Sequence, residues 1–237
     1  MKYRIVYYTA LDYKIMPSYK WFVLDEDDNI EGEFHTEIEA KQMVSELKGE
    51  VFNGFNIREK FQNMSLEEVQ EIQVQNSQNY AVAALNIDGN LNLGNLIRSA
   101  VIFGANKFYI FGNRKYDKRS TVGADNYIDI EFIPFNINED AGEKVIDSIL
   151  NDGYTPIAIE QGGAKLDGTP FLRFIDKPCF ILGSESHGVP KTVLDYCRHK
   201  FEIPQVGVMR SLNVSTAGGI IMFEYCRMMS SCSGITY

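Results

Sequence analysis

The chain has 237 residues, 45% of them apolar, and a formal net charge of −9 at pH 7. This length and apolar content suffice for one main domain with a substantial core and one smaller additional piece. No apolar run approaches the roughly 20 residues of a membrane span, and the first segment lacks the apolar stretch and cleavage site of a secretory signal, so we expect a soluble, cytoplasmic protein with no membrane partner.

The first 70 residues predict a small α+β module. Residues 3–9, 20–25 and 31–35 are typical of β-strands, and the acidic stretch between the last two is typical of a turn. Residues 36–48 predict a helix, because Thr36 is followed three residues later by Glu39 in the pattern of a capping box. The module contains no visible chemistry, so we expect it to recruit a substrate or a partner.

After a connector at residues 53–78, the pattern changes to short apolar strands that alternate with amphipathic helices. Strands are predicted at 80–86, 107–112, 155–161, 179–185 and 200–205, and helices at 92–104, 143–153 and 190–197. A terminal helix begins at Val214, because apolar and small residues recur there at helical spacing. Residues 71–237 therefore predict an α/β domain, a parallel sheet with helices on both faces, whose ligands bind beyond the carboxyl ends of the strands.

The acidic charge is concentrated in the front part of the chain. Residues 1–75 hold 8 basic and 15 acidic residues, whereas residues 76–237 hold 15 basic and 17 acidic residues. The rear part also has a basic loop at residues 112–120, which contains Arg114, Lys115, Lys118 and Arg119. These cations are candidates for phosphate contacts with a nucleic acid, and a solvated surface turn is the alternative.

The spacing of the cysteines does not predict a metal site. Cys179, Cys197, Cys226 and Cys232 include no Cys-x-x-Cys pair and have no histidine at metal-binding spacing. We therefore expect free, buried thiols and no bound metal.

Three segments pass from apolar residues into glycine and polar residues where strands or helices meet. They are residues 92–105 (NLGNLIRSAVIFGA), 180–190 (FILGSESHGVP) and 202–229 (EIPQVGVMRSLNVSTAGGIIMFEYCRMM). Singly, each has an ordinary explanation, since Gly183 could serve a strand-end turn and Ser211 or Asn213 could either cap the terminal helix or bind a ligand. In this order and spacing they resemble the three motifs of the SpoU/TrmH group in the SPOUT superfamily of RNA ribose 2'-O-methyltransferases. The resemblance covers about residues 70–230.

The last segment resembles in particular the domain of tRNA guanosine 2'-O-methyltransferases. The resemblance implies a carboxyl-terminal trefoil knot that binds S-adenosylmethionine, a homodimer whose sites are completed across the interface, and an RNA substrate. We expect tRNA, with ribosomal RNA as the alternative. A non-catalytic RNA-binding protein with the same fold is the other class of function, which the presence of all five polar motif positions disfavours.

Matched to the family motifs, this chain has five catalytic positions and three cofactor-binding positions. The catalytic positions are Asn92, Arg98, Glu185, Ser211 and Asn213. The cofactor-binding positions, which the family uses mainly through main-chain groups, are Gly183, Ile203 and Leu212.

Arg98 is expected at the centre of the chemistry. A guanidinium rarely loses a proton, so a role as a base remains open beside a role as a charged group that stabilises a developing alkoxide. His187 occupies a variable position of the second motif and is expected on the loop surface. The terminal helix is expected to offer a second copy more apolar surface than one stripe needs. Its residues with this role are Ile221, Met222, Phe223, Tyr225 and Met228.

Overall fold

A computed structural model describes residues 2–8, 20–34, 37–48, 57–62, 64–85, 87–113, 115–134, 141–166, 172 and 174–233. The chain divides into two compact units, Met1–Glu71 and Ile72–Tyr237. Each unit is described by itself below.

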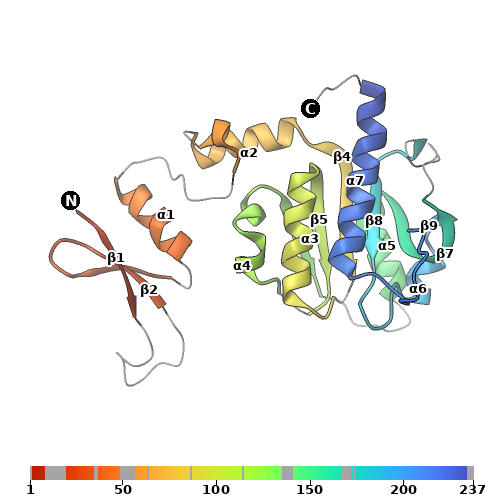
Figure 1. The fold of residues 1–237 in the computed structure, drawn as a ribbon, viewed down its shortest axis with the longest axis horizontal. Coiled ribbons are helices and arrows are strands. Elements are labelled where there is room, and N and C mark those ends of the chain that lie inside the picture. The colour runs from red at the N-terminus through yellow and green to blue at the C-terminus, as the bar shows by residue number, and fades with distance from the viewer. Residues whose placement is uncertain are drawn as a thin grey trace. The chain divides into compact units, whose positions relative to one another are not determined.

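The front unit is a three-stranded antiparallel sheet with one helix. The strands are β1 (Arg4–Tyr8), β2 (Lys20–Leu24) and β3 (Ile30–Phe34), in the order β1-β2-β3. Helix α1 (Glu37–Lys48) contacts all three strands (Figure 1). Buried residues include Val23 and Leu24 on β2 and Ala40 on α1. The predicted strands and helix are confirmed, whereas Thr36 of the predicted capping box lies outside the described residues.

The stretch predicted as a connector contains helices, so that prediction was wrong. It holds the short helix η1 (Glu59–Phe61) and the helix α2 (Leu66–Gln75). The start of α2 is a capping box, in which the Glu68 amide donates to the Ser65 hydroxyl at 3.2 Å and the Ser65 amide donates to the Glu68 carboxylate at 2.8 Å. This Ser-x-x-Glu pattern was the sequence signal for the helix.

The rear unit is built on a six-stranded parallel sheet, as predicted. Its strands are β4 (Gln78–Leu85), β5 (Ala105–Phe111), β6 (Asp129–Ile133), β7 (Thr155–Lys165), β8 (Pro178–Leu182) and β9 (His199–Glu202). The strand order is β6-β5-β4-β8-β7-β9. Strand β6 was not predicted, because an edge strand is half exposed and lacks the continuous apolar run of the central strands.

Helices cover both faces of this sheet. On one face lie α3 (Asn90–Ile102) and α7 (Val214–Ser233), which contact each other (Figure 1). Their core includes Tyr80, Val82 and Ala84, which alternate on β4 with Ala81 and Ala83 of the opposite core. On that opposite face lie α5 (Ala141–Asn151) and α6 (Lys191–Leu194). The short helices α4 (Lys118–Thr121) and η2 (Ala124–Asn126) lie beside α3.

Helix α7 forms as predicted, but it is buried over a wider arc than one stripe. Tyr225 packs edge-on against Tyr80, with ring centroids 5.0 Å apart, and against Phe180 at 5.5 Å. Ile221, Met222 and Met228 are also buried within the chain. Of the five residues expected to offer apolar surface to a second copy, only Phe223 does so, with 54% of its surface exposed. The expectation was wrong for the other four because the sheet and α3 already cover them.

Candidate functional site

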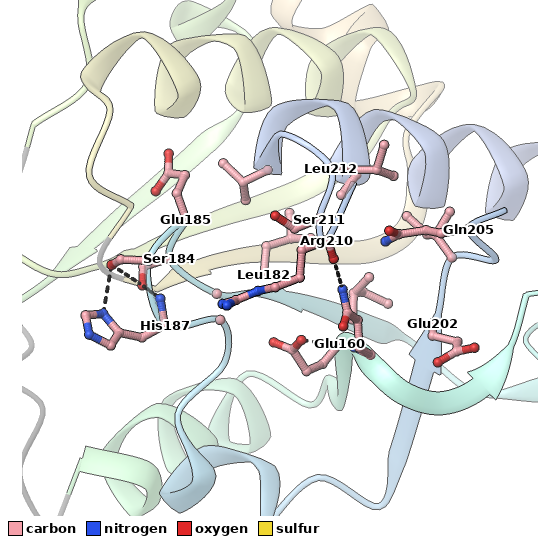
Figure 2. A pocket seen from close by; sticks show the side chains of 18 residues that line it. Glu160, Leu182, Ser184, Glu185, His187, Glu202, Gln205, Arg210, Ser211 and Leu212 are labelled. Carbon is pink, nitrogen blue, oxygen red and sulfur yellow. Dashed lines mark hydrogen bonds between the residues drawn. The ribbon is translucent and has the colours of Figure 1, made fainter. Parts of the chain in front are cut away.

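A cavity of about 220 Å³ opens where β8 and β9 end, beside the middle of β7 (Figure 2). Four stretches line it: the middle of β7, the end of β8 with the loop after it, the end of β9 with the segment that leads to α7, and the first turn of α7. The lining residues are Ile159, Glu160, Gln161, Leu182, Gly183, Ser184, Glu185, Ser186, His187, Gly188, Glu202, Ile203, Gln205, Arg210, Ser211, Leu212, Val214 and Ala217. This is the carboxyl-end position at which parallel sheets bind ligands.

The loop after β8 folds back on itself and requires glycine at two places. A Cβ at Gly183 would lie 1.9 Å from the Gly188 carbonyl carbon, so only glycine permits this approach of the two backbones. Gly188 has a φ of +66°, and its amide donates to the Ser184 carbonyl at 2.8 Å. The loop is tied to β7 because the Val189 amide donates to the Glu160 carboxylate at 2.8 Å. The backbone itself therefore forms one wall of the cavity.

A chain of hydrogen bonds joins the three predicted motifs at one side of the cavity. The Asn92 amide nitrogen donates to the Glu185 carboxylate at 2.6 Å, and the Asp88 backbone amide donates to the other carboxylate oxygen at 2.9 Å. The Asn213 Nδ2 donates to the Asn92 Oδ1 at 3.1 Å. The Asn213 Oδ1 in turn accepts from the Ser215 amide at 2.9 Å, which caps α7. Asn213 thus both caps the helix and joins the motifs.

The cavity gathers most of the residues that the sequence singled out. Gly183, Glu185, Ile203, Ser211 and Leu212 all line it. Two more do not line it but are joined to Glu185: Asn92 is hydrogen-bonded to Glu185, and Asn213 is hydrogen-bonded to Asn92.

Arg98 does not line the cavity of its own chain. At 100° per residue, Arg98 is turned by about 120° around α3 from Asn92, which faces the start of α7. Arg98 follows Gly94 by one turn, and a Cβ at Gly94 would lie 1.7 Å from the Ser120 hydroxyl on α4. Arg98 is half-buried on the flank of α3 that faces α4.

Sequence reasoning missed three charged residues of the cavity, namely Glu160, Glu202 and Arg210. The Gly162 amide donates to the Glu202 carboxylate at 2.7 Å, and the Gln161 side-chain amide donates to the Arg210 carbonyl. Each glutamate directly follows an apolar strand residue, but only Glu202, at the end of β9, carried the signal of a polar residue at a strand's carboxyl end, since Glu160 lies in the middle of β7.

His187 has an exposed side chain on the loop after β8. Its Nδ1 lies 2.7 Å from the Ser186 hydroxyl, which donates to the Asp88 carboxylate at 3.1 Å. Figure 2 shows the ring on the outer side of the loop, away from Arg210 and Leu212. The predicted surface position of His187 is confirmed by this placement.

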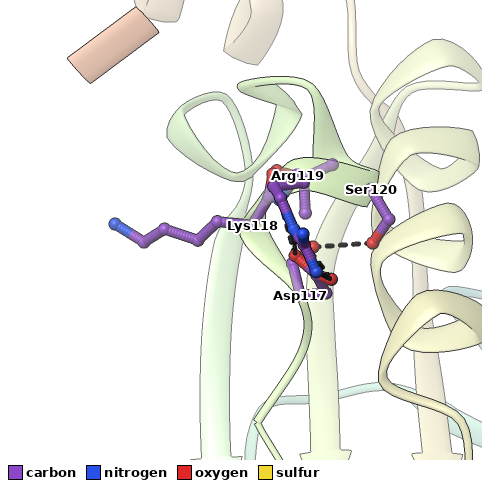
Figure 3. Close-up of polar contacts among 5 residues, drawn as sticks. Asp117, Lys118, Arg119 and Ser120 are labelled. Atoms are coloured by element: carbon purple, nitrogen blue, oxygen red, sulfur yellow. Dashed lines mark hydrogen bonds and ion pairs between the residues drawn. The ribbon is translucent and has the colours of Figure 1, made fainter. Parts of the chain in front are cut away.

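The basic loop is only partly available for phosphate contacts. Arg119 forms a two-pronged ion pair with Asp117, the cap of α4, with its Nη2 at 2.7 Å and its Nε at 3.0 Å from the carboxylate oxygens (Figure 3). Hydrogen bonds from Arg119 lower the pKa of Asp117. Lys115 and Lys118 are exposed, and the Lys118 side chain extends away from Asp117 (Figure 3). Arg114 lies outside the described residues.

Among the described residues, no group of histidine, cysteine, aspartate and glutamate side chains could hold a metal ion. Cys179 and Cys226 are buried free thiols and Cys197 is a half-buried free thiol. Burial raises the pKa of Cys226 to about 11.

Of the helices in the described ranges, none combines the length and apolarity that crossing a membrane requires.

Comparison with known proteins relates the rear unit to RNA-modifying enzymes. The sequence model described as the SpoU rRNA Methylase family matches residues 79–223. The mouse tRNA (guanosine(18)-2'-O)-methyltransferase is 32% identical over 152 residues, which are 62% of this chain but 9% of that protein. The chain thus spans less than a tenth of the length of that relative.

Two solved structures share the fold of the rear unit. The TrmH/SpoU tRNA modifying enzyme of A. aeolicus aligns with a TM-score of 0.58 and 22% identity, over 71% of this chain and 84% of that one. An AdoMet-bound rRNA methyltransferase from Sinorhizobium meliloti aligns with a TM-score of 0.54 and 26% identity, over 67% of this chain and 59% of that one.

Proposed function

The chain belongs to the SpoU rRNA methylase family, and we propose that it is an S-adenosylmethionine-dependent RNA ribose 2'-O-methyltransferase that acts on a guanosine of tRNA. One observation carries the proposal: residues of three segments far apart in sequence meet at one cavity through the Glu185–Asn92–Asn213 hydrogen bonds. A protein that only bound RNA would need neither this linked polar chain nor the cavity beside it.

The choice of tRNA rests on the name of the mouse relative, which is a tRNA guanosine methyltransferase. Ribosomal RNA is the second candidate, because the Sinorhizobium meliloti structure is described as an rRNA methyltransferase. Both substrates offer the same ribose 2'-hydroxyl, so the cavity cannot distinguish them, and the RNA-binding surface must do so.

The cavity suits S-adenosylmethionine. Because Gly183 has no side chain, its backbone is accessible to a ligand at the cavity wall. Ile203 and Leu212 supply apolar surface for a planar adenine. When bound, this donor supplies an activated methyl group. The chain's own task is to orient the ribose and to assist loss of its proton. We propose that Ser211, which lines the cavity, and the Glu185–Asn92–Asn213 chain hold that orientation. The hydrogen bonds of Asn92 fix the Glu185 and Asn213 side chains before substrate arrives.

We propose that Arg98 reaches the cavity of a second copy in a homodimer. Its position on the α4 flank, outside its own cavity, supports this arrangement. The segment between β9 and α7 also supports it, because Val206 and Val208 are fully exposed and 78% of Met209 is exposed. Arg98 would act there either as the base or as a charged group that stabilises the developing alkoxide. A monomer in sedimentation at micromolar concentration would contradict this part of the proposal.

Lys118 and Arg119 lie on α4, which packs beside α3 on the flank where Arg98 lies. We propose that Lys115, Lys118, Arg119 and Arg114 contact RNA phosphates there. Neutralising all four should weaken RNA binding and flatten its salt dependence. Because Asp117 already pairs with Arg119, neutralising Arg119 alone should produce only a small part of the change. If the dependence of RNA affinity on salt concentration did not change, these residues would be part of a solvated surface turn and would not contact RNA.

Two structural features remain proposals. We propose that the segment between β9 and α7 passes through the loop after β8 as a trefoil knot, which is supported by the common cavity that both stretches line. We also propose that residues 1–70 form an accessory module that recruits substrate. We further propose a cytoplasmic location for the protein, which is supported by its buried free thiols.

Methyl transfer from labelled S-adenosylmethionine to purified tRNA and to ribosomal RNA tests the function directly. We expect incorporation into tRNA, and mapping of ribose methylation should locate it at a guanosine. Arg98→Ala should lower transfer a hundredfold or more, on the order of the loss of one positioned catalytic group, with donor affinity unchanged. Arg198→Ala, which removes an exposed cation outside the cavity, is the matched control. Normal transfer by Arg98→Ala would refute the assignment, and no transfer to either RNA would refute the function.

A further inference from the structure

The cavity holds one arginine among three glutamates. Arg210 lines it together with Glu160, Glu185 and Glu202, yet within the described part of the chain its guanidinium has no hydrogen bond or ion pair. An arginine this close to carboxylates would ordinarily form a two-pronged pair with one of them. The reason that it does not lies in the partners that the glutamates already have.

Each glutamate already accepts hydrogen bonds that hold the cavity walls. Glu160 accepts from the Gln161 amide at 3.0 Å and from the Val189 amide at 2.8 Å. Glu185 accepts from the Asn92 side-chain amide at 2.6 Å, and Glu202 accepts from the Gly162 amide at 2.7 Å. The carboxylates are therefore structural, and a guanidinium without a partner is left for a ligand.

Arg210 is an exposed residue whose side chain lines the cavity. Its carbonyl accepts from the side-chain amide of Gln161 in β7, which fixes the backbone of this residue. Figure 2 shows the side chain extending from the segment beside Leu212 across the cavity, toward Ser184 and Glu160. The guanidinium thus reaches the end of the cavity opposite the apolar Leu212.

We propose that Arg210 binds the carboxylate of the methionine half of the donor, an inference that rests on the proposed function. A guanidinium matches a carboxylate with two parallel hydrogen bonds. With adenine against Ile203 and Leu212, the amino-acid half extends toward the loop after β8, where the guanidinium lies. An RNA phosphate is the other anion available, but the inward direction of Arg210 favours a ligand within the cavity.

A comparison of S-adenosylmethionine with its decarboxylated form tests this inference by calorimetry without RNA, so it does not depend on activity. Wild-type protein should bind S-adenosylmethionine about 10-fold to 100-fold more tightly than the decarboxylated form, the range of a hydrogen bond to a charged group. Arg210→Ala should weaken the binding of S-adenosylmethionine by the same factor, so that the variant binds both forms of the donor with similar affinity. Arg198→Ala should behave as wild type. Thermal unfolding of each variant separates loss of binding from loss of fold.

A preference for the carboxylate that survives in a folded Arg210→Ala variant would overturn the inference. So would unchanged S-adenosylmethionine affinity with weakened RNA binding, which would assign Arg210 to an RNA phosphate. If wild-type protein bound neither form of the donor, the proposed function itself would fail, an outcome distinct from both.

Discussion

Replacing Gly183 with alanine should disrupt both the cavity and the stability of the rear unit. The new Cβ would lie 1.9 Å from the carbonyl carbon of Gly188 and 2.1 Å from the amide nitrogen of Val189. Both contacts are with backbone atoms, so no side-chain rotation can relieve the overlap. The loop after β8 would have to move away from the end of the strand.

The size of the effect follows from what that movement breaks. The two backbone hydrogen bonds between Ser184 and Gly188, at 3.2 and 2.8 Å, would be lost, and each contributes about 1 kcal/mol. Overpacking adds roughly 1 to 3 kcal/mol. The sum is about 4 kcal/mol, which lowers the melting temperature of a unit of this size by roughly 8 to 16 °C.

Thermal unfolding followed by circular dichroism and donor binding followed by calorimetry measure the two consequences of Gly183→Ala. Gly207→Ala is the matched control, because nothing lies within 4 Å of a Cβ at that position. We expect Gly207→Ala to melt and bind as wild type. If Gly183→Ala kept the wild-type melting temperature and donor affinity, the close backbone approach would not be what shapes the cavity.

Three further predictions concern separate parts of the chain. Asn213→Ala should destabilise the rear unit by about 1 kcal/mol in urea unfolding through loss of the α7 cap, whereas Asn213→Asp, which keeps the capping oxygen, should lose less. Hydrogen bonds from Lys107 and then Tyr109 lower the pKa of Asp152, so its stabilising contribution is complete above about pH 5 and is lost as the pH falls through the folded-state pKa. The difference in the free energy of unfolding between wild type and Asp152→Asn should therefore become smaller from pH 7 to pH 3. A difference that stays constant over this range would contradict the reasoning. Deletion of residues 1–71 should leave the donor affinity unchanged in calorimetry, and its loss would show that the front unit contributes to the cavity.

The elements of this protein were largely predictable because they depend on neighbours in sequence. The apolar spacing from Val214 onward predicted α7, and the alternation of apolar strands with helices predicted the parallel sheet. The edge strand β6 was missed because a half-exposed strand lacks a continuous apolar run. Helix α2 was missed although the Ser-x-x-Glu capping box at its start was a local signal for it. The motif residues could be named from the sequence, since their types and spacing resemble a known family.

What those residues do to one another was decided only by the tertiary structure. The strand order β6-β5-β4-β8-β7-β9 brings together loops that are distant in the chain, so Asn92, Glu185 and Asn213 become hydrogen-bonded. The same packing turns Arg98 toward α4, and among the described residues it leaves the Arg210 guanidinium in the cavity without a hydrogen bond or ion pair. Sequence periodicity specifies which face of an element is buried, but it carries no information on which elements become neighbours. Neighbours are selected by the packing of the whole sheet, and the site is made at the places where those neighbours meet.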